Sequence, residues 1–271
     1  KKKKSLTTNF VRDGIALSDH ETADSFNDYF VNAASDLLKE SVHDLNSDCH
    51  FNVSFNSQSM FCSPVSSREI IDIVLGMKNA TSPGFDDISI SVVKRVIHLI
   101  SEPLCRIFNC SFMHGIFPTQ MKIAKVIPIY KKGDHSLFSN YRPISLLSTF
   151  SKILERCMYN RLFKFIQKHD LLFSHQFGFR PKHSTSSALI EFVHHITCAL
   201  DAKLFSITLF LDLTKAFDCL DHSILINKLN RYGIRGTLLS WFDSYLSSRK
   251  QFMYYNIMQQ NVKTIKCGVP Q

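Results

Sequence analysis

The sequence lacks the features that mark membrane and secreted proteins. Within its 271 residues, no apolar run reaches the roughly 18–20 residues that a bilayer-spanning helix requires. The four lysines at its start are not followed by the apolar stretch of a secretory signal. There is no initiating Met, so we expect the chain to be a piece of a longer reading frame. No internal repeat is evident, and we expect no membrane partner.

Cysteines with zinc-ligand spacing are also missing. The eight cysteines form no C-x-x-C pair, and the two closest, Cys105 and Cys110, lie in an apolar stretch with helical periodicity. None of the twelve histidines joins them in a Cys/His cluster of the kind that holds structural zinc. This usage favours reduced thiols in an intracellular protein.

The composition is that of a folded protein with one basic segment. Hydrophobic residues make up 45% of the chain, which argues against disorder, and the length allows one or two domains. Residues 115–185 hold 12 Lys and Arg against 3 Asp and Glu, whereas the other 200 residues hold 20 of each sign. Such a segment is typical of proteins with a phosphate-rich partner. The alternative is a solvated basic face, although the Pro, Gly and aromatic residues within the segment favour an ordered groove over a basic tail.

Apolar periodicity predicts a mixed α and β fold. Helices are predicted over 22–40 with Asp24 near the start, from Ser66, from about Ser89, from about Glu102, over 151–169, over 185–202, and twice more before Ser248. Strands are predicted over 122–130, over 204–211 and as a hairpin over 250–267, with Lys131-Lys132-Gly133-Asp134 as a hairpin-type turn. The Ser- and Asn-rich residues 41–63 are expected to form a loop.

Asp212 is the most informative single residue. It ends the apolar run 204–211, which is expected to be a buried strand, and the pattern that follows is helical up to Gly233. A carboxylate at the end of a buried strand needs a cation, a hydrogen-bond donor or a metal, and Mg²⁺ prefers such hard oxygen ligands. The alternative is that Asp212 caps the next turn or pairs with Lys215.

Six blocks of sequence carry a resemblance to a known family. They are "KNATSPGFDDI" at 78–88, "FPTQMKIAKVIPIYKKGD" at 117–134, "NYRPISLLSTFSKILE" at 140–155, "QFGFRPKHSTSSA" at 176–188, "FLDLTKAFDCLDH" at 210–222 and "CGVPQ" at 267–271. In this order they resemble the reverse transcriptases of non-LTR retrotransposons, the jockey and CR1-like LINE elements. The resemblance extends over nearly the whole chain from about Asp24.

The resemblance implies an α/β (α+β) right-hand polymerase fold. Residues 1–63 would be an N-terminal extension with one amphipathic helix and a loop, 64–203 a mostly helical fingers region, and 204–271 the start of the palm sheet, with the thumb absent. The implied function is RNA-directed DNA polymerase, which joins nucleotides by a two-metal mechanism with Mg²⁺, or alternatively Mn²⁺. The implied partners are an RNA template, a DNA primer and dNTPs, and the implied location is the nucleus, or else the cytoplasm.

The resemblance also assigns roles to residues of the nucleotide site. Asp212 would be the catalytic metal ligand. Arg142 matches the family's triphosphate-binding Arg, whose planar fork suits phosphate oxygens. Either Lys131 or Lys132 would contact phosphate, the alternative being a solvated turn. Phe217 matches the aromatic residue that excludes a ribose 2′-hydroxyl, and its alternative role is ordinary core packing. Gln271 and the adjacent Pro270 match the block that lines the nucleotide pocket.

A further block would follow the template. Gln176, Gly178, Phe179 and Arg180 match residues along the family's template path. Phe179 would offer a stacking face and Arg180 a phosphate contact, as in proteins that track single-stranded RNA. For Phe179, and for the neighbouring Phe177, core packing is an equally good interpretation.

The carboxylates that complete the family's metal site are not evident. In the family they come from a Tyr/Phe-x-Asp-Asp hairpin after the G-x-P-Q block, and this sequence ends within that block. Asp86 and Asp87 lie upstream in a turn signal and are expected to be structural, whereas Asp218 and Asp221 are expected to cap or pair. We therefore expect the chain alone to be inactive. The alternative function is a non-catalytic RNA-binding remnant of a decayed or domesticated element, and a metal-dependent hydrolase is less well supported because no acid cluster accompanies Asp212.

Overall fold

The computed structural model describes residues 10–12, 15–40, 55–79, 82–213, 215–255, 258–259, 262–265 and 267–269. The chain divides into two compact units, one formed by Lys1–Arg161 with Lys215–Gln271 and the other by Leu162–Thr214. The predicted mixture of helices and strands is confirmed. Among the described residues, no helix is both long and apolar enough to cross a membrane.

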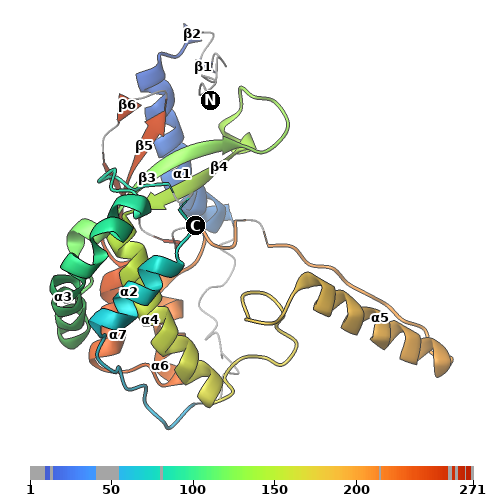
Figure 1. The fold of residues 1–271 in the computed structure, drawn as a ribbon. Coiled ribbons are helices and arrows are strands. Elements are labelled where there is room, and N and C mark those ends of the chain that lie inside the picture. Colours follow the sequence, from blue (N-terminus) through green and yellow to red (C-terminus); the bar gives the residue numbers. More distant parts are fainter. Residues whose placement is uncertain are drawn as a thin grey trace. The chain divides into compact units, whose positions relative to one another are not determined.

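The first unit is built on a mixed sheet (Figure 1). Its long strands are β3 (Ile123–Tyr130), β4 (Tyr141–Leu147) and β5 (Lys250–Tyr255), and its short strands are β6 (Met258–Gln259) and β7 (Lys263–Thr264). β3 pairs with β4 antiparallel and with β5 in parallel, while β6 and β7 both pair antiparallel with β5. The predicted strand at 122–130 is confirmed, and its fully buried side chains include Ala124 and Val126, which alternate with less buried ones.

Helix α1 (Asp19–Glu40) packs on this sheet and starts earlier than predicted. Asp24 is not its start signal, because Ser18 and Glu21 form the cap: the Glu21 amide donates to Ser18 Oγ, and the Ser18 amide donates to Glu21 Oε2 at 2.9 Å. Phe26 lies in the core between α1 and the sheet, where its ring meets those of Tyr141 and Tyr255. A two-residue ladder of β1 (Val11–Arg12) and β2 (Ile15–Ala16) precedes α1.

The other helices of this unit are α2 (Ser67–Gly76), α3 (Ile90–His114), α4 (Thr149–Lys168, of which the residues up to Arg161 belong here), α6 (His222–Tyr232) and α7 (Thr237–Leu246). The helix predicted to start near Ser89 is confirmed, since Ser89 precedes the first residue of α3, but the separate helix predicted from Glu102 is wrong, because α3 runs unbroken through Pro103. Its buried residues, among them Val93, Ile97, Leu104 and Phe108, continue at helical spacing past the proline, so packing holds the helix together despite one missing backbone donor.

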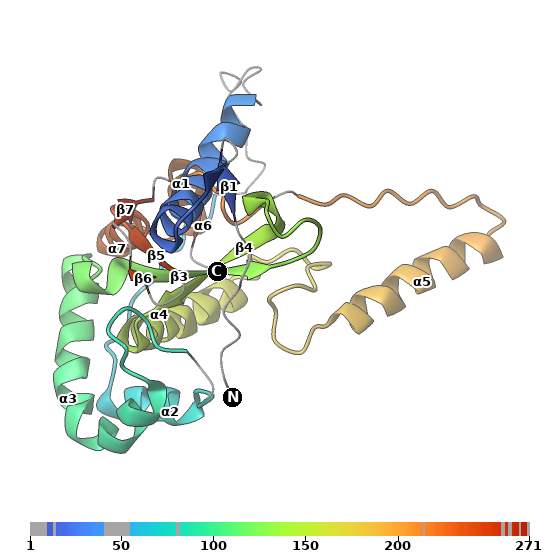
Figure 2. The same cartoon turned by 90° about the horizontal axis from the view of Figure 1, so that it is seen from above.

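The second unit contains the rest of α4, a loop, α5 (Thr185–Asp201) and residues 204–213. The prediction of a buried strand over 204–211 is wrong. The segment is extended but unpaired, and its apolar side chains are exposed, with the Phe205 ring fully accessible. It runs back beside α5 (Figure 2), and the rings of Phe192 and Phe210 lie 5.8 Å apart. An apolar run becomes a sheet strand only beside a hydrogen-bonding neighbour, and no described strand pairs with this one.

Candidate nucleotide and nucleic-acid site

The β3–β4 hairpin carries three of the predicted cations. Lys131 and Lys132 are exposed in the connection that follows β3, and Arg142 is exposed at the second position of β4, where it pairs in register with Ile129. The connection is longer than a tight hairpin turn, because β4 begins only at Tyr141.

Hydrogen bonds order this connection. The Lys131 amide donates to the Asn140 carbonyl at 2.8 Å, and the Asn140 side chain donates to the Asp134 carbonyl at 2.8 Å. Gly133 has a φ of +94°, a conformation that favours glycine. The two lysines and Arg142 therefore lie on one ordered β-hairpin.

The turn that carries Phe217 is fastened to the segment that leads to Gln271. The Val269 amide donates to the Phe217 carbonyl and the Gly268 amide to the Leu220 carbonyl, both at 2.9 Å. His222 Nε2 lies 2.8 Å from the Gly268 carbonyl oxygen. Gly268 has a φ of +81°, and a Cβ there would lie 2.6 Å from the Asp218 carbonyl oxygen, so only glycine allows this approach. Gln271 and Pro270 lie outside the described residues.

The hairpin and the turn border one cavity of about 50 Å³, which Pro143, Ser145, Asp218, Arg249 and Gly268 help to line. Burial raises the pKa of the Asp218 carboxyl, and the ammonium of Lys215 only partly offsets this. The structure thus brings the neighbours of Arg142 and Phe217 together around the same space. The Phe217 ring is 45% exposed, so it is not an ordinary core residue, and its role in sugar selection stays a prediction.

Arg249 is the residue that sequence reasoning missed. It is 2% exposed, and its Nε and Nη2 atoms have no hydrogen-bond partner among the described residues. Its Nη1 donates to the Tyr245 carbonyl at 3.1 Å, and its guanidinium lies over the Tyr245 ring. The sequence offered no signal beyond an arginine just before a strand, because burial of a charged group depends on the tertiary fold.

The candidate template residues lie in the second unit, in the loop before α5. Phe179 is 87% exposed, so the core-packing interpretation is wrong for this ring, whereas Phe177 is partly buried. Arg180 donates to the Phe173 and Ser174 carbonyls at 3.2 and 3.4 Å, and Gln176 Nε2 donates to the Gly178 carbonyl at 3.1 Å. These bonds order the loop and leave other donors of Arg180 available for a ligand.

Asp212 is exposed in the extended segment of the second unit. No hydrogen bond or ion pair to its carboxylate occurs among the described residues, and its predicted alternative partner, Lys215, places its ammonium over the Tyr29 ring of α1. Within the same residues, no group of three or more His, Cys, Asp and Glu is arranged to hold a metal ion. The residues described do not by themselves fit a Mg²⁺ or Mn²⁺ site.

The other carboxylates have structural partners. Asp86 accepts from Ser148 Oγ at 2.6 Å, and Asp87 pairs with Lys125 at 3.0 Å, as expected for structural residues. Asp221 caps α6 by accepting from the Ile224 amide at 3.0 Å, which confirms the predicted cap. Hydrogen bonds from the Ser223 hydroxyl and the Ile224 amide hold the pKa of Asp221 below its ordinary value.

Comparison with known proteins points in one direction. The family model described as "Reverse transcriptase (RNA-dependent DNA polymerase)" matches residues 129–271. The "Probable RNA-directed DNA polymerase from transposon BS" of Drosophila melanogaster is 32% identical over 215 residues, which are 77% of this chain and 23% of that protein. The "RNA-directed DNA polymerase from mobile element jockey" of Drosophila funebris is 32% identical over 213 residues, with the same two coverages of 77% and 23%. The chain thus matches about a quarter of the length of these relatives.

Proposed function

Because the chain belongs to the reverse transcriptase family, we propose that it forms the nucleotide- and template-binding part of an RNA-directed DNA polymerase of a non-LTR retrotransposon. Its first unit then corresponds to much of the fingers and the beginning of the palm of a right-hand polymerase. The partners are an RNA template, a DNA primer and dNTPs, and DNA synthesis takes place in the nucleus.

The observation that carries this proposal is that the β3–β4 hairpin, which exposes Arg142 and the two lysines after β3, and the turn of Phe217 border the same small cavity. Arg142 on β4 binds the triphosphate through its planar fork, and Lys131 or Lys132 on the adjoining connection adds a second phosphate contact. Phe217 closes the space beside the sugar. In the second unit, Phe179 stacks on a template base and Arg180 contacts its backbone.

The chemical step itself requires carboxylates beyond those described. Asp212 is the metal ligand that the resemblance implies, and among the described residues no group of three or more His, Cys, Asp and Glu accompanies it, whereas Mg²⁺ and Mn²⁺ need several oxygen ligands to be held in place. We therefore assign these residues to binding and orientation of nucleotide and template, and derive no step of nucleotidyl transfer from them.

Sugar selection tests the nucleotide site. In a complete polymerase that carries this chain, Phe217→Val should relax the preference for dNTP over rNTP by about 1–3 kcal/mol, because a shorter side chain stops rejecting the 2′-hydroxyl. The measurement is the ratio of kcat/KM for a matched dNTP and rNTP. Phe205→Val, which shortens a fully exposed ring, is the matched control. An unaltered ratio in a folded Phe217 variant would remove this residue from the nucleotide site.

A second candidate function is RNA binding without catalysis. It is favoured by one observation, the exposed and unaccompanied carboxylate of Asp212. Primer extension on an RNA template separates the two candidates. A working polymerase that contains this chain should incorporate dNTPs, and its Asp212→Asn variant should lose turnover. A non-catalytic remnant should bind RNA but incorporate no dNTP, whether it carries Asp212 or Asn. The chain of 271 residues alone should not extend a primer.

A further inference from the structure

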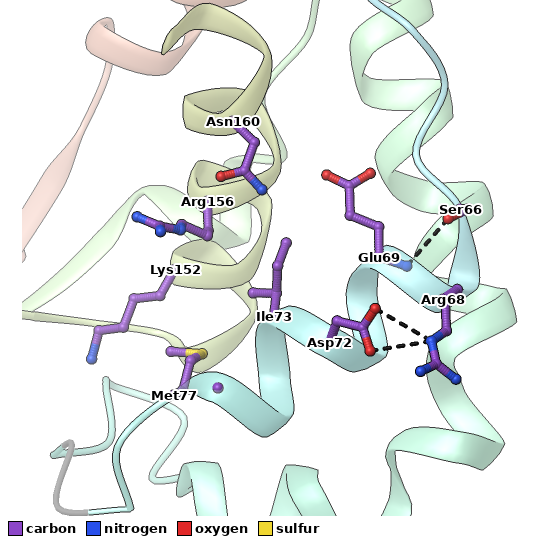
Figure 3. Close-up of a pocket in the computed structure, with 10 residues that line it drawn as sticks. Ser66, Arg68, Glu69, Asp72, Ile73, Met77, Lys152, Arg156 and Asn160 are labelled. Carbon is purple, nitrogen blue, oxygen red and sulfur yellow. Dashed lines mark hydrogen bonds and ion pairs between the residues drawn. The ribbon is translucent and has the colours of Figure 1, made fainter. Parts of the chain in front are cut away.

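An open groove of about 790 Å³ lies between α2 and α4 in the first unit (Figure 3). None of its lining residues borders the cavity beside Arg249, so it is a second and larger hollow. Ile73 and Met77 are the apolar side chains of its lining, whereas most of the side chains around it are charged or polar.

Helix α4 contributes three side chains with nitrogen donors to the lining of this groove. Lys152, Arg156 and Asn160 all line it, and Figure 3 shows them one above another along the helix. Residues four apart lie on the same helical face, about 6 Å apart along the axis. The row repeats its donors along the groove, which suits a ligand with repeated anionic groups better than a single small anion.

The carboxylates on the opposite wall are already paired. Asp72 on α2 lies 3.2 Å from Arg68. Glu69 accepts two hydrogen bonds from Arg161, at 2.8 and 2.9 Å. These two acids therefore do not neutralise Lys152 and Arg156, and the groove keeps a net positive charge.

The two cations are held in place but incompletely compensated. Lys152 Nζ donates to the Ser82 carbonyl at 3.2 Å, and partial burial lowers its pKa, with only partial compensation from Glu155 and Asp86. The guanidinium of Arg156 lies 4.8 Å from the centre of the Tyr159 ring. An anionic group in the groove would supply the missing compensation for Lys152.

We propose that this groove binds the phosphate backbone of an RNA strand, with Lys152 and Arg156 contacting phosphates and Asn160 donating to a backbone oxygen. The inference rests on the proposed RNA-binding function and adds a contact surface on α4. RNA is favoured over an acidic peptide because the groove offers few apolar side chains to anchor one. Both cations also belong to the segment 115–185, which contains the whole net charge of the chain.

The test is a salt titration of the 271-residue chain with a single-stranded RNA oligonucleotide. The double variant Lys152→Ala, Arg156→Ala should bind about tenfold more weakly, and the slope of log K against log salt should fall in magnitude by about 1.4, or about 0.7 for each phosphate that is no longer neutralised. The charge-matched control Arg95→Ala, Arg106→Ala removes two exposed arginines of α3 and should change neither quantity.

Further variants and ligands keep the test decisive. Arg156→Glu alters an exposed side chain, so it should fold normally and bind RNA more weakly than Arg156→Ala, while Arg156→Lys should keep the wild-type slope. If the wild-type chain binds RNA and the groove variants match the control, the groove assignment is wrong while the proposed function stands. If the wild-type chain does not bind RNA, both are wrong. Groove variants with weakened binding only to a poly-glutamate peptide, or only to single-stranded DNA, would overturn the choice of RNA.

Discussion

Helices α3 and α5 differ in how far their apolar side chains are buried. The two helices are about equally apolar in composition, yet α3 buries residues such as Val93, Ile97 and Phe108, and none of the described residues of α5 is fully buried. The same contrast separates β3, whose Ala124 and Val126 are buried, from the exposed apolar residues 204–213. Burial, and with it the energetic value of a side chain, is decided by neighbours that composition does not reveal.

Substitutions of two phenylalanines should give the largest difference in the free energy of unfolding. Phe26 is fully buried among the rings of Phe10, Phe138 and Tyr141, so Phe26→Ala should lower the free energy of unfolding by about 3–5 kcal/mol. Phe205→Ala removes the same atoms from an exposed position and should change it by no more than about 0.5 kcal/mol. Urea unfolding of the two variants measures both values, and equal losses of stability would break the comparison.

Alanine substitutions at two glycines should give the next largest difference in stability. Gly268→Ala should cost about 1–3 kcal/mol, because φ is +81° and the new methyl group would collide with the Asp218 carbonyl. Gly178→Ala meets no atom within 4 Å and should be neutral, or stabilising by about 0.4–1 kcal/mol. Melting curves give the two shifts, and hydrogen exchange at Val269 reports whether its bond to Phe217 has loosened. Unchanged protection of the Val269 amide from exchange in the Gly268 variant would argue against the close contact between Gly268 and the Phe217 turn.

Two helix caps give the smallest effect. Asp221→Ala should destabilise the first unit by about 1 kcal/mol at neutral pH, since it removes the cap of a packed helix. Ser184 caps α5 by accepting from the Ser187 amide, and Ser184→Ala should fray that helix without shifting the melting of the first unit. Circular dichroism and thermal melting separate these outcomes.

The Asp221 contribution should also depend on pH. Its pKa is lowered in the folded chain, so the unfolded chain binds the proton more readily, and the stabilisation is present above the ordinary value of 3.8. It should disappear as the pH falls through the lower folded pKa, and the difference between wild type and Asp221→Ala should shrink accordingly. A difference that stays constant down to strongly acidic pH would contradict an ionised cap.

What the sequence allowed us to predict follows the same division. The strand at 122–130 and the helices at 66, 151–169 and 185–202 were predictable because their apolar periodicity is local. The start of α1 was predictable but missed, since Ser18-Asp19-His20-Glu21 has the S-x-x-E spacing of a capping box. The strand at 204–211 was predicted wrongly because pairing depends on a partner strand, which periodicity cannot supply.

The candidate site divides in a similar way. Arg142 and Phe217 were found from sequence blocks, and the structure sets their neighbours around one cavity. Arg249 and the groove residues Lys152 and Arg156 could not be found in that way, because their environment arises from elements far apart in the chain. Local sequence patterns indicate the secondary structure and the motifs of a segment. Tertiary contacts decide which charged side chains are buried and which line a cavity or groove.

The central claim is that the β3–β4 hairpin belongs to a nucleic-acid polymerase, and the salt dependence of RNA binding tests it most directly. The triple variant Lys131→Ala, Lys132→Ala, Arg142→Ala should bind RNA in the presence of dNTP more weakly than the wild-type chain, because the contacts that hold the triphosphate of the template-paired dNTP are lost. The control Arg95→Ala, Arg106→Ala, Arg231→Ala removes as many exposed charges outside the basic segment and should leave the affinity for RNA and the slope of log K against log salt unchanged. A wild-type slope near zero, or a hairpin variant that matches the control, would contradict the claim.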